Sequence, residues 1–262
     1  MSSDSTGSRP RTSDELVHLE VADGVATVTL DSPANRNALS RRLLDDLTRR
    51  LDAAAADESV RVILLRSSQR VFCAGADMRE AVEDGMAAAA RALVALQRQV
   101  VSLPVPVLVR LDGPVRAGGL GIVGAADVVL AADTVSFALT ESRLGLAPAV
   151  ISLTLLPRMT PRAAALTALS GAAFHAHDAV AYGLVTRTVP APELDAAVDA
   201  LVEEFRQATR QGVRETKQLL NAPLVARIDR LGEQVAAQSA RLFASDEARA
   251  AMRAFLARSA PS

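Results

Sequence analysis

Near its start the chain alternates apolar and polar residues in two short runs, 16–21 and 25–30, which the segment Ala-Asp-Gly separates. This alternation predicts two strands joined by a tight hairpin turn. From position 41 onward leucines recur at helical spacing, and Ser40 stands where it would cap that helix. We therefore expect a hairpin followed by a helix that ends near Ala55.

Two later runs, 60–66 and 105–111, are largely apolar. Such runs indicate strands buried on both faces, as in a parallel sheet. A helix is predicted between them at 86–103, so right-handed crossovers in an α/β sheet are expected. After Ala138 the sequence is mostly helical. The helices predicted there cover 149–158, 161–170, 176–182, 193–211, 213–219, 224–244 and 246–257, with one strand at 184–189.

After the second apolar run comes the segment 112–127, DGPVRAGGLGIVGAAD. Its glycines predict a tight turn, and the small residues that follow predict a helix able to pack closely. The backbone N–H groups at the start of such a helix can bind negative charge. Glycines at this place are common in α/β proteins. The segment is neither a G-x-G-x-x-G dinucleotide fingerprint nor a P-loop.

A second loop, 67–79, follows the other apolar strand and carries Gly75 and Ala76. Open α/β sheets bind their ligands where the carboxyl ends of parallel strands meet, so both loops are expected at one edge. The amides near Gly75-Ala76 and near Gly118-Gly119 would then face one substrate oxygen from two sides. Such a pair of donors can stabilise an enolate oxygen.

The composition narrows the classes of protein that fit. Half of the 262 residues are hydrophobic but only 3 % are aromatic, so Ala, Val and Leu must build the core. The net charge of −1 gives no field that attracts nucleic acid or an anionic membrane, and no run reaches the roughly 18 apolar residues of a membrane span. The single cysteine, Cys73, excludes an internal disulfide and fits a reducing compartment, so the cytoplasm is expected. Residues 1–13 lack the apolar segment of a secretory signal and are expected to form a disordered tail.

Five groups of motifs follow one another along the chain. They are Ser32-Pro33 with Arg36–Ser40, Phe72–Met78, Asp112-Gly113 with Ala117–Gly119 and Asp127, Phe137–Glu141 with Arg143–Pro148, and Gly183–Val185. In this order and spacing they resemble the crotonase (enoyl-CoA hydratase/isomerase) superfamily over about residues 16–259. The resemblance implies an α/β fold with a crotonase-like spiral core of ββα units at 14–195 and a helical C-terminal trimerisation region at 196–262.

The resemblance also implies what the protein binds. The expected substrate is an acyl-CoA thioester of fatty acid metabolism, with coenzyme A as part of the substrate and no other cofactor or metal ion. The expected assembly is a homotrimer or a hexamer made of two trimers, without nucleic acid or membrane partners.

Residue by residue, the resemblance makes the backbone N–H groups of Ala76 and Gly118 the two donors to the thioester oxygen. It makes Glu141 the catalytic acid/base, and an apolar pocket would move the pKa of that carboxyl toward neutrality, which suits the role. Without the resemblance, a glutamate at this place would be interpreted as a surface residue in a first helical turn. The residues implied to contact CoA are Ala74, Asp77, Met78, Arg79 and, toward a neighbouring subunit's CoA, Arg258.

One departure from the family pattern bears on the reaction. Well-known hydratases of this family carry a second glutamate at the position of Gly121, which has no side chain to activate water. The glycine-rich turn after Pro148 is also changed, to Ala-Val-Ile-Ser. One glutamate suffices to move a proton between two carbons, as the isomerisation of a 3-enoyl to a 2-enoyl thioester requires.

Several functions therefore stay open. We place hydration of an enoyl-CoA first because hydratases predominate in the family, and isomerisation of its double bond second. A non-catalytic acyl-CoA-binding protein is the alternative from another class, although a pure binder has no need of Glu141. Thioester hydrolysis or decarboxylation on the same scaffold completes the set.

Overall fold

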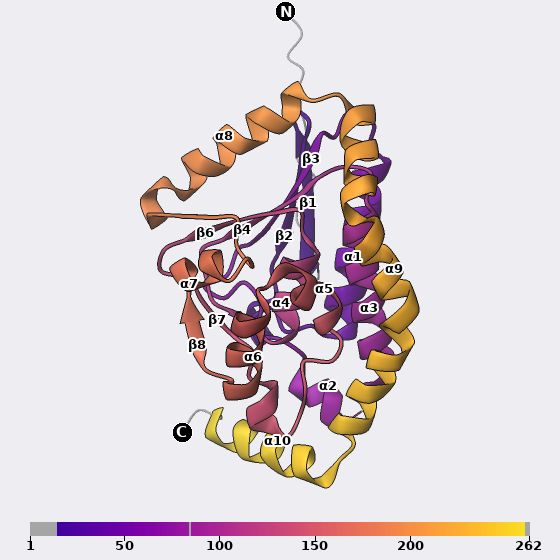
Figure 1. The fold of residues 1–262 in the computed structure, drawn as a ribbon, viewed down its shortest axis with the longest axis vertical. Helices are drawn as coiled ribbons and strands as arrows, with labels where there is room; N and C mark the ends of the chain where they lie inside the picture. The colour runs from indigo at the N-terminus through magenta and orange to yellow at the C-terminus, as the bar shows by residue number, and fades with distance from the viewer. Residues whose placement is uncertain (1–14, 84, 260–262) are drawn as a thin grey trace, which may run out of the picture.

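The computed structural model describes residues 15–83 and 85–259 (Figure 1). The tail predicted at 1–13 lies outside these residues. In Figure 1 a twisted sheet runs through the middle of the molecule. The long helix α9 (Arg210–Phe243) follows one side of it, and α10 (Asp246–Ser259) crosses the lower end.

The main sheet has six strands in the order β1-β2-β3-β4-β6-β9. The first two strands pair antiparallel, and all other neighbours are parallel. The turn between the first two contains Asp23 and Gly24 with φ of 49° and 78°, the left-handed backbone that a tight hairpin turn requires. The predicted hairpin and parallel strands are thus confirmed. The six strands are β1 (Val17–Ala22), β2 (Val25–Leu30), β3 (Val62–Ser67), β4 (Val107–Leu111), β6 (Val128–Ala132) and β9 (Arg187–Val189).

A second sheet contains three short strands in the order β5-β7-β8. β5 (Val115–Arg116) is parallel to β7 (Ser136–Ala138), and β7 is antiparallel to β8 (Ala173–His175). The sequence pattern does not predict β8, because alternation cannot be recognised over three residues. The strand is identified only by its pairing with β7.

The helices follow the predicted order, with two differences. Ser40 caps α1 as expected, and its hydroxyl oxygen accepts a hydrogen bond of 3.2 Å from the Leu43 N–H. The first difference is the short helix α2, which begins within the predicted loop. The helices before α9 are α1 (Arg41–Ala56), α2 (Met78–Glu83), α3 (Ala87–Ser102), α4 (Gly118–Ala125), α5 (Ser152–Arg158), α6 (Pro161–Ser170), α7 (Ala176–Ala181) and α8 (Leu194–Gln207).

The second difference is that α9 is continuous, where the sequence pattern predicts a break between 219 and 224. Pro223 lies inside this helix. A proline there removes one backbone hydrogen bond and costs about 3 kcal/mol. Asn221 offsets this cost, because its side-chain amide donates to the Val101 carbonyl and to an Asp127 oxygen, both at 3.1 Å. Tertiary contacts therefore override the local signal for a break.

Lys217 is the only lysine of the chain, and it binds α9 to α3 and to the segments that precede β4 and β6. Its side chain is 6 % exposed, forms an ion pair of 2.7 Å with Asp127 and donates at 3.0 Å to the carbonyls of Val100 and Val105. Burial lowers the pKa of the Lys217 ammonium, and the Asp127 charge opposes that change. This buried charge is both paired and hydrogen-bonded, as a stable buried charge must be.

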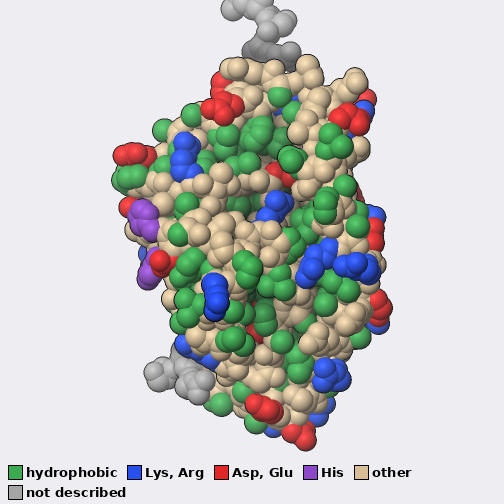
Figure 2. Space-filling view, in the orientation of Figure 1, with side chains coloured by type: hydrophobic (Ala, Val, Ile, Leu, Met, Phe, Trp, Pro, Cys, Tyr) green, Lys and Arg blue, Asp and Glu red, His purple; other side chains and the backbone are tan. Residues whose placement is uncertain are grey.

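The surface carries several large apolar side chains. Figure 2 shows hydrophobic side chains recurring across the middle of the face that Figure 1 presents, with acidic ones mainly at its margins. Among the described helices, none is both long and apolar enough to cross a membrane. The exposed leucines of α5, α6 and α9 are Leu156, Leu166, Leu169, Leu219 and Leu220.

Candidate active site

Two loops that follow parallel strands lie side by side, and backbone hydrogen bonds hold them together. The Arg116 N–H donates to the Cys73 carbonyl at 2.9 Å, and the Phe72 N–H donates to the Pro114 carbonyl at 3.0 Å. The loops thus meet next to the start of α4, as the order of the strands predicts.

Ala76 and Gly118 come together at this meeting point. A side-chain carbon added at Gly118 would lie 3.7 Å from the Ala76 nitrogen, and one added at Gly75 would lie 3.5 Å from the Gly118 nitrogen. Within the described residues, neither the Ala76 N–H nor the Gly118 N–H has a backbone acceptor. Both residues line one cavity, so two unused backbone donors border the same space.

The residue before Gly118 has a strained backbone. Ala117 has φ 44° and ψ −119°, and such a conformation costs a non-glycine residue about 1–3 kcal/mol. Its N–H donates to the Ala138 carbonyl at 3.0 Å, which holds the turn against β7. Gly119 lets the loops approach, because a Cβ there would lie 2.7 Å from the Cys73 Cβ. The chain can therefore turn sharply into α4 with its first N–H beside the neighbouring loop.

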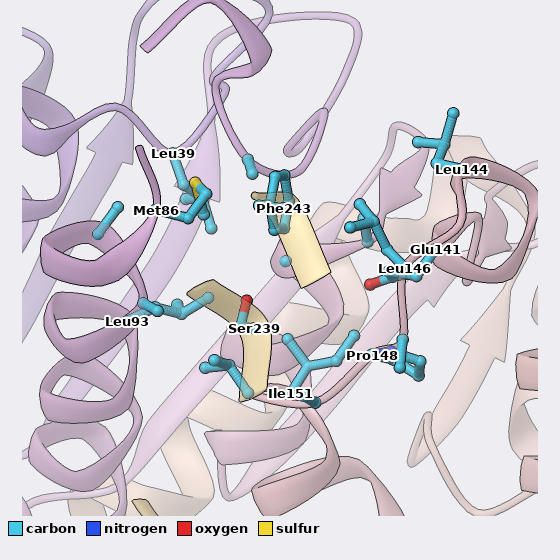
Figure 3. Close-up of a pocket in the computed structure, with 18 of the residues that line it drawn as sticks. Leu39, Met86, Leu93, Glu141, Leu144, Leu146, Pro148, Ile151, Ser239 and Phe243 are labelled. Atoms are coloured by element: carbon cyan, nitrogen blue, oxygen red, sulfur yellow. The ribbon is translucent and has the colours of Figure 1, made fainter. Parts of the chain in front are cut away.

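The cavity has a volume of about 60 Å³ and a mostly apolar wall (Figure 3). α3 supplies one side, the segment 140–151 another, and the C-terminal part of α9 a third. Of the described residues on the wall, those with polar side chains are Thr140, Glu141 and Ser239. The apolar side chains include Leu39, Met78, Met86, Leu93, Leu146, Ile151 and Phe243.

Glu141 begins the short helix η2 (Glu141–Leu144) and is only 8 % exposed. Its Oε2 is buried and has no hydrogen-bond partner among the described residues. Burial raises the pKa of Glu141 from 4.5 to about 7, while its own backbone N–H acts in the opposite direction. Figure 3 shows the carboxyl pointing into the cavity. A carboxyl whose pKa lies near neutrality can take and return a proton near pH 7.

The position of Gly121 has no room for a longer side chain. A Cβ there would lie 2.7 Å from Ile151 Cγ2 and 3.3 Å from Gln97 Oε1. Gln97 is itself fixed, because the buried Thr154 hydroxyl donates to the same oxygen at 2.7 Å. The two departures from the family pattern, Gly121 and the altered turn after Pro148, therefore lie in contact. Ile151 fills the space that a side chain at position 121 would need.

Two of the residues implied to contact CoA lie at or beside the cavity. Met78 lines it together with Ala76. Asp77 borders a smaller neighbouring cavity. Its carboxylate accepts hydrogen bonds of 3.0 Å from the Asn35 side chain and from the Arg79 N–H. Asp77 thus holds the loop and the start of α2 in place.

The other residues implied to contact CoA are not brought to either of these two cavities. Ala74 is half-buried and Arg79 is exposed, and neither is among the residues that line them. Arg258 belongs to α10, but its side chain lies outside the described residues. The structure therefore groups Ala76, Gly118, Glu141 and Met78 in one cavity, and the contacts of the remaining residues with CoA stay predictions.

The sequence pattern did not single out the residues that α9 contributes. Ser239 and Phe243 lie one turn apart on this helix, and both line the cavity opposite Glu141 (Figure 3). The only sequence signal for Ser239 is that a polar residue continues the buried face of α9 that includes Ala236, and this signal is weak. A polar residue on a buried helix face indicates a site only when the neighbouring elements are known.

The chain is similar to known proteins over most of its length. A family model described as enoyl-CoA hydratase/isomerase matches residues 20–262. The chain is also similar to an enoyl-CoA hydratase of known structure from Mycobacterium avium. The two are 45 % identical with a TM-score of 0.88, and the similarity covers 94 % of this chain and 97 % of that one.

Two further relatives have names that refer to different reactions. Methylglutaconyl-CoA hydratase of Rattus norvegicus is 30 % identical over 214 residues, which is 78 % of this chain and 68 % of the relative. The trans-2-decenoyl-[acyl-carrier-protein] isomerase of Streptococcus mutans is 28 % identical over 209 residues, 76 % of this chain and 79 % of the relative. Proteins similar to this chain therefore include both a hydratase and an isomerase.

Proposed function

The chain belongs to the enoyl-CoA hydratase/isomerase (crotonase) family and is an enzyme of that type with the crotonase fold, and from this we propose how its site works. The backbone N–H groups of Ala76 and Gly118 bind the thioester oxygen of an enoyl-CoA. Glu141 then moves the proton at the carbon next to that thioester. The observation that carries this proposal is a buried carboxyl, whose Oε2 has no hydrogen-bond partner among the described residues, in the same cavity as two backbone donors without a backbone acceptor there.

The proposed main reaction is hydration of a 2-enoyl-CoA. A water oxygen attacks the β-carbon, one water proton passes to the Glu141 carboxylate, and the electrons of the double bond move into the thioester enolate. The two backbone donors stabilise this oxyanion, and one such donor is worth about 2.7–4 kcal/mol in well-studied enzymes. Glu141 then gives the proton to the α-carbon, which restores the carboxylate and completes the addition of water.

Isomerisation of a 3-enoyl-CoA to a 2-enoyl-CoA is the second candidate. Here the Glu141 carboxylate takes an α-proton, the same donors hold the dienolate, and Glu141 returns the proton to the γ-carbon. A specific observation favours this reaction. Glu141 is the only ionisable residue among the described residues of the cavity wall, and Ile151 closes the position where a second carboxylate would project.

Paired substrates of matched chain length distinguish the two reactions. Loss of the conjugated thioester absorbance with a 2-enoyl-CoA, together with formation of the 3-hydroxyacyl-CoA, supports hydration. A gain of that absorbance with the 3-enoyl-CoA supports isomerisation. Tight binding of both esters without turnover would contradict both reactions and favour an acyl-CoA-binding protein. Release of free CoA or of CO₂ would indicate hydrolysis or decarboxylation.

We further propose that Ala74, Asp77, Met78 and Arg79 lie along the CoA arm and that Arg258 reaches a neighbouring subunit's CoA. The proposed chemistry uses backbone amides and one carboxyl, so coenzyme A in the substrate is the only cofactor it needs. Turnover should then be unchanged in EDTA, and a loss that added metal restores would contradict this. Weaker binding of CoA by the Arg79→Ala variant would support the proposal that these residues contact CoA.

The proposed assembly is a homotrimer or a hexamer of two trimers, in the cytoplasm, acting in fatty acid metabolism. The exposed leucines of α6 and α9 support association, because contact with another subunit would remove these apolar side chains from water. Sedimentation equilibrium would test this, and a monomer at micromolar concentration would contradict it. The buried free thiol of Cys73 is consistent with a reducing compartment.

A further inference from the structure

Ser239 is a buried residue whose own helix does not use its hydroxyl. The residue is 7 % exposed, and its hydroxyl makes no hydrogen bond to the other described residues. Two other helical hydroxyls of this chain, those of Thr167 and Ser170, donate to the carbonyl four residues earlier, at 2.8 Å and 2.6 Å. The Ser239 hydroxyl therefore keeps both its donor and its acceptor capacity for another group.

This hydroxyl faces Glu141 across the cavity. In Figure 3 the oxygen of Ser239 points into the open space from α9, and the carboxyl of Glu141 points into it from the opposite wall. The side chains next to Ser239 in this view are Leu93 and Ile151, both apolar. Two unpartnered polar side chains thus share a cavity whose wall is otherwise largely apolar.

We propose that Ser239 is the second group that positions the water for hydration, together with Glu141. The inference rests on the hydration proposed above. Buried water is stably held where it finds about two to four polar partners, and buried polar groups left without a hydrogen bond destabilise the protein. Ile151 removes the possibility of a carboxylate at position 121, whereas Ser239 offers a hydroxyl in the cavity that Ile151 also lines.

The two residues have separate tasks in this arrangement. The Ser239 hydroxyl accepts a hydrogen bond from one O–H of the water, and the Glu141 carboxylate accepts the other. The oxygen lone pair of the water is then free to attack the β-carbon. Only the proton on the Glu141 side is transferred, and it ends on the α-carbon. Ser239 neither gains nor loses a proton, so it acts as a positioning residue.

Contacts between α3 and α9 hold Ser239 in place. Arg91 forms an ion pair of 2.6 Å with Glu233, and Gly232 brings the helices so close that a Cβ there would lie 2.8 Å from Val94 Cγ1. Ser239 is about two turns beyond Gly232 on the same helix. A rigid support of this kind matters because misplacing a reacting group by about 1 Å can cost 10²-fold in rate.

Substitutions at Ser239 separate water addition from proton transfer. Two reactions are measured: hydration of a 2-enoyl-CoA, and exchange of the α-protons of butyryl-CoA in deuterated water, which needs Glu141 and the two amides but no attacking water. We expect Ser239→Ala to lower hydration by about ten- to a hundredfold and to leave exchange within about twofold. Ser239→Thr and Ser239→Val have nearly the same shape, so hydration should survive only in the variant that keeps the hydroxyl.

A control variant removes a hydroxyl of the same helix that lies outside the cavity. Thr216 is exposed on α9, and Thr216→Val should leave hydration and exchange within about twofold of the wild type. Equal loss of both reactions in Ser239→Ala, or equal hydration in Ser239→Thr and Ser239→Val, would overturn the role of Ser239 and leave the proposed hydration standing. A wild-type enzyme that exchanges α-protons but does not hydrate would overturn the hydration and this inference together.

Discussion

Replacing Glu141 by Gln keeps the size of the side chain but removes the group that carries the proton. A general acid/base contributes about 10²–10⁴-fold to a rate, so kcat should fall by that factor. At about 1.4 kcal/mol per tenfold, this corresponds to roughly 3–5 kcal/mol of the activation barrier. Binding of the CoA ester should change little, because the two backbone donors and the CoA contacts are retained.

The same substitution also tests whether burial raises the pKa of Glu141, because a raised pKa makes the free energy of unfolding depend on pH. Glu141 is 8 % exposed, and its pKa rises from 4.5 to about 7 on folding. The folded state therefore favours the protonated form. The contribution of Glu141 to the free energy of unfolding is fully present below pH 4.5 and is lost as the pH rises through 7. At about 1.4 kcal/mol per pKa unit, the wild type should lose roughly 3 kcal/mol across this range through Glu141 alone.

The Glu141→Gln variant has no such dependence, so the difference in unfolding free energy should shift by roughly 2.5 kcal/mol in its favour between pH 5 and pH 8. Urea denaturation at a series of pH values measures this difference. In the wild type, kcat/KM for α-proton exchange should rise with pH and level off above about 7, as ionised Glu141 accumulates.

Glu204→Gln is a suitable control, because Glu204 is an exposed glutamate on α8. That variant should match the wild type in rate and in the pH dependence of stability. If Glu141→Gln differs from the wild type by the same unfolding free energy at every pH, the carboxyl does not titrate near neutrality inside the fold. A near-normal kcat in a folded variant would remove Glu141 from the chemistry.

Three further substitutions test other parts of the structure. Gly118→Ala places a Cβ 2.9 Å from Leu39 Cδ1 and 3.7 Å from the Ala76 nitrogen. Both N–H groups remain, but the added methyl group crowds the Ala76 donor and should lower kcat/KM by up to about 10²–10³-fold, while the Kd for free CoA measured by calorimetry stays within twofold; unchanged turnover would contradict the oxyanion site. Gly121→Glu alone should destabilise the protein, because its Cβ would lie 2.7 Å from Ile151 Cγ2. Combined with Ile151→Gly it should fold and raise the ratio of hydration to α-proton exchange, and an unchanged ratio in the folded double variant would show that position 121 does not limit water addition. Lys217→Met leaves the Asp127 carboxylate without its buried partner and should cost about 3–5 kcal/mol in urea denaturation. A loss below 1 kcal/mol would show that the pair does not anchor α9.

Much of the fold could be predicted because local signals agree with the tertiary structure. Ser40 precedes leucines at helical spacing and caps α1, and the apolar runs become parallel strands of the main sheet. The sequence fails where distant contacts override a local rule. Pro223 predicts a break, but Asn221 and Lys217 bind the neighbouring core and keep α9 continuous.

In the candidate site, too, the residues of local motifs could be predicted and the contacts between distant segments could not. Ala76, Gly118 and Glu141 could be identified because each belongs to a short motif with its own spacing. The contact between Gly121 and Ile151 could not, although both changes are visible in the sequence, because nothing local shows that they touch. Ser239 was missed for a related reason. Its hydroxyl can be recognised as part of a site only from the cavity that α3 and the segment 140–151 form with α9.

The enclosure of Lys217 has a chemical consequence for an enzyme that handles thioesters. Thioesters acylate free amines without a catalyst, and exposed lysines are the usual targets of that side reaction. Here the ammonium is covered by Asp127 and two main-chain carbonyls, so the folded chain offers its substrate no lysine amine. Its many arginines keep their protons at neutral pH and supply positive charge that acyl transfer does not consume.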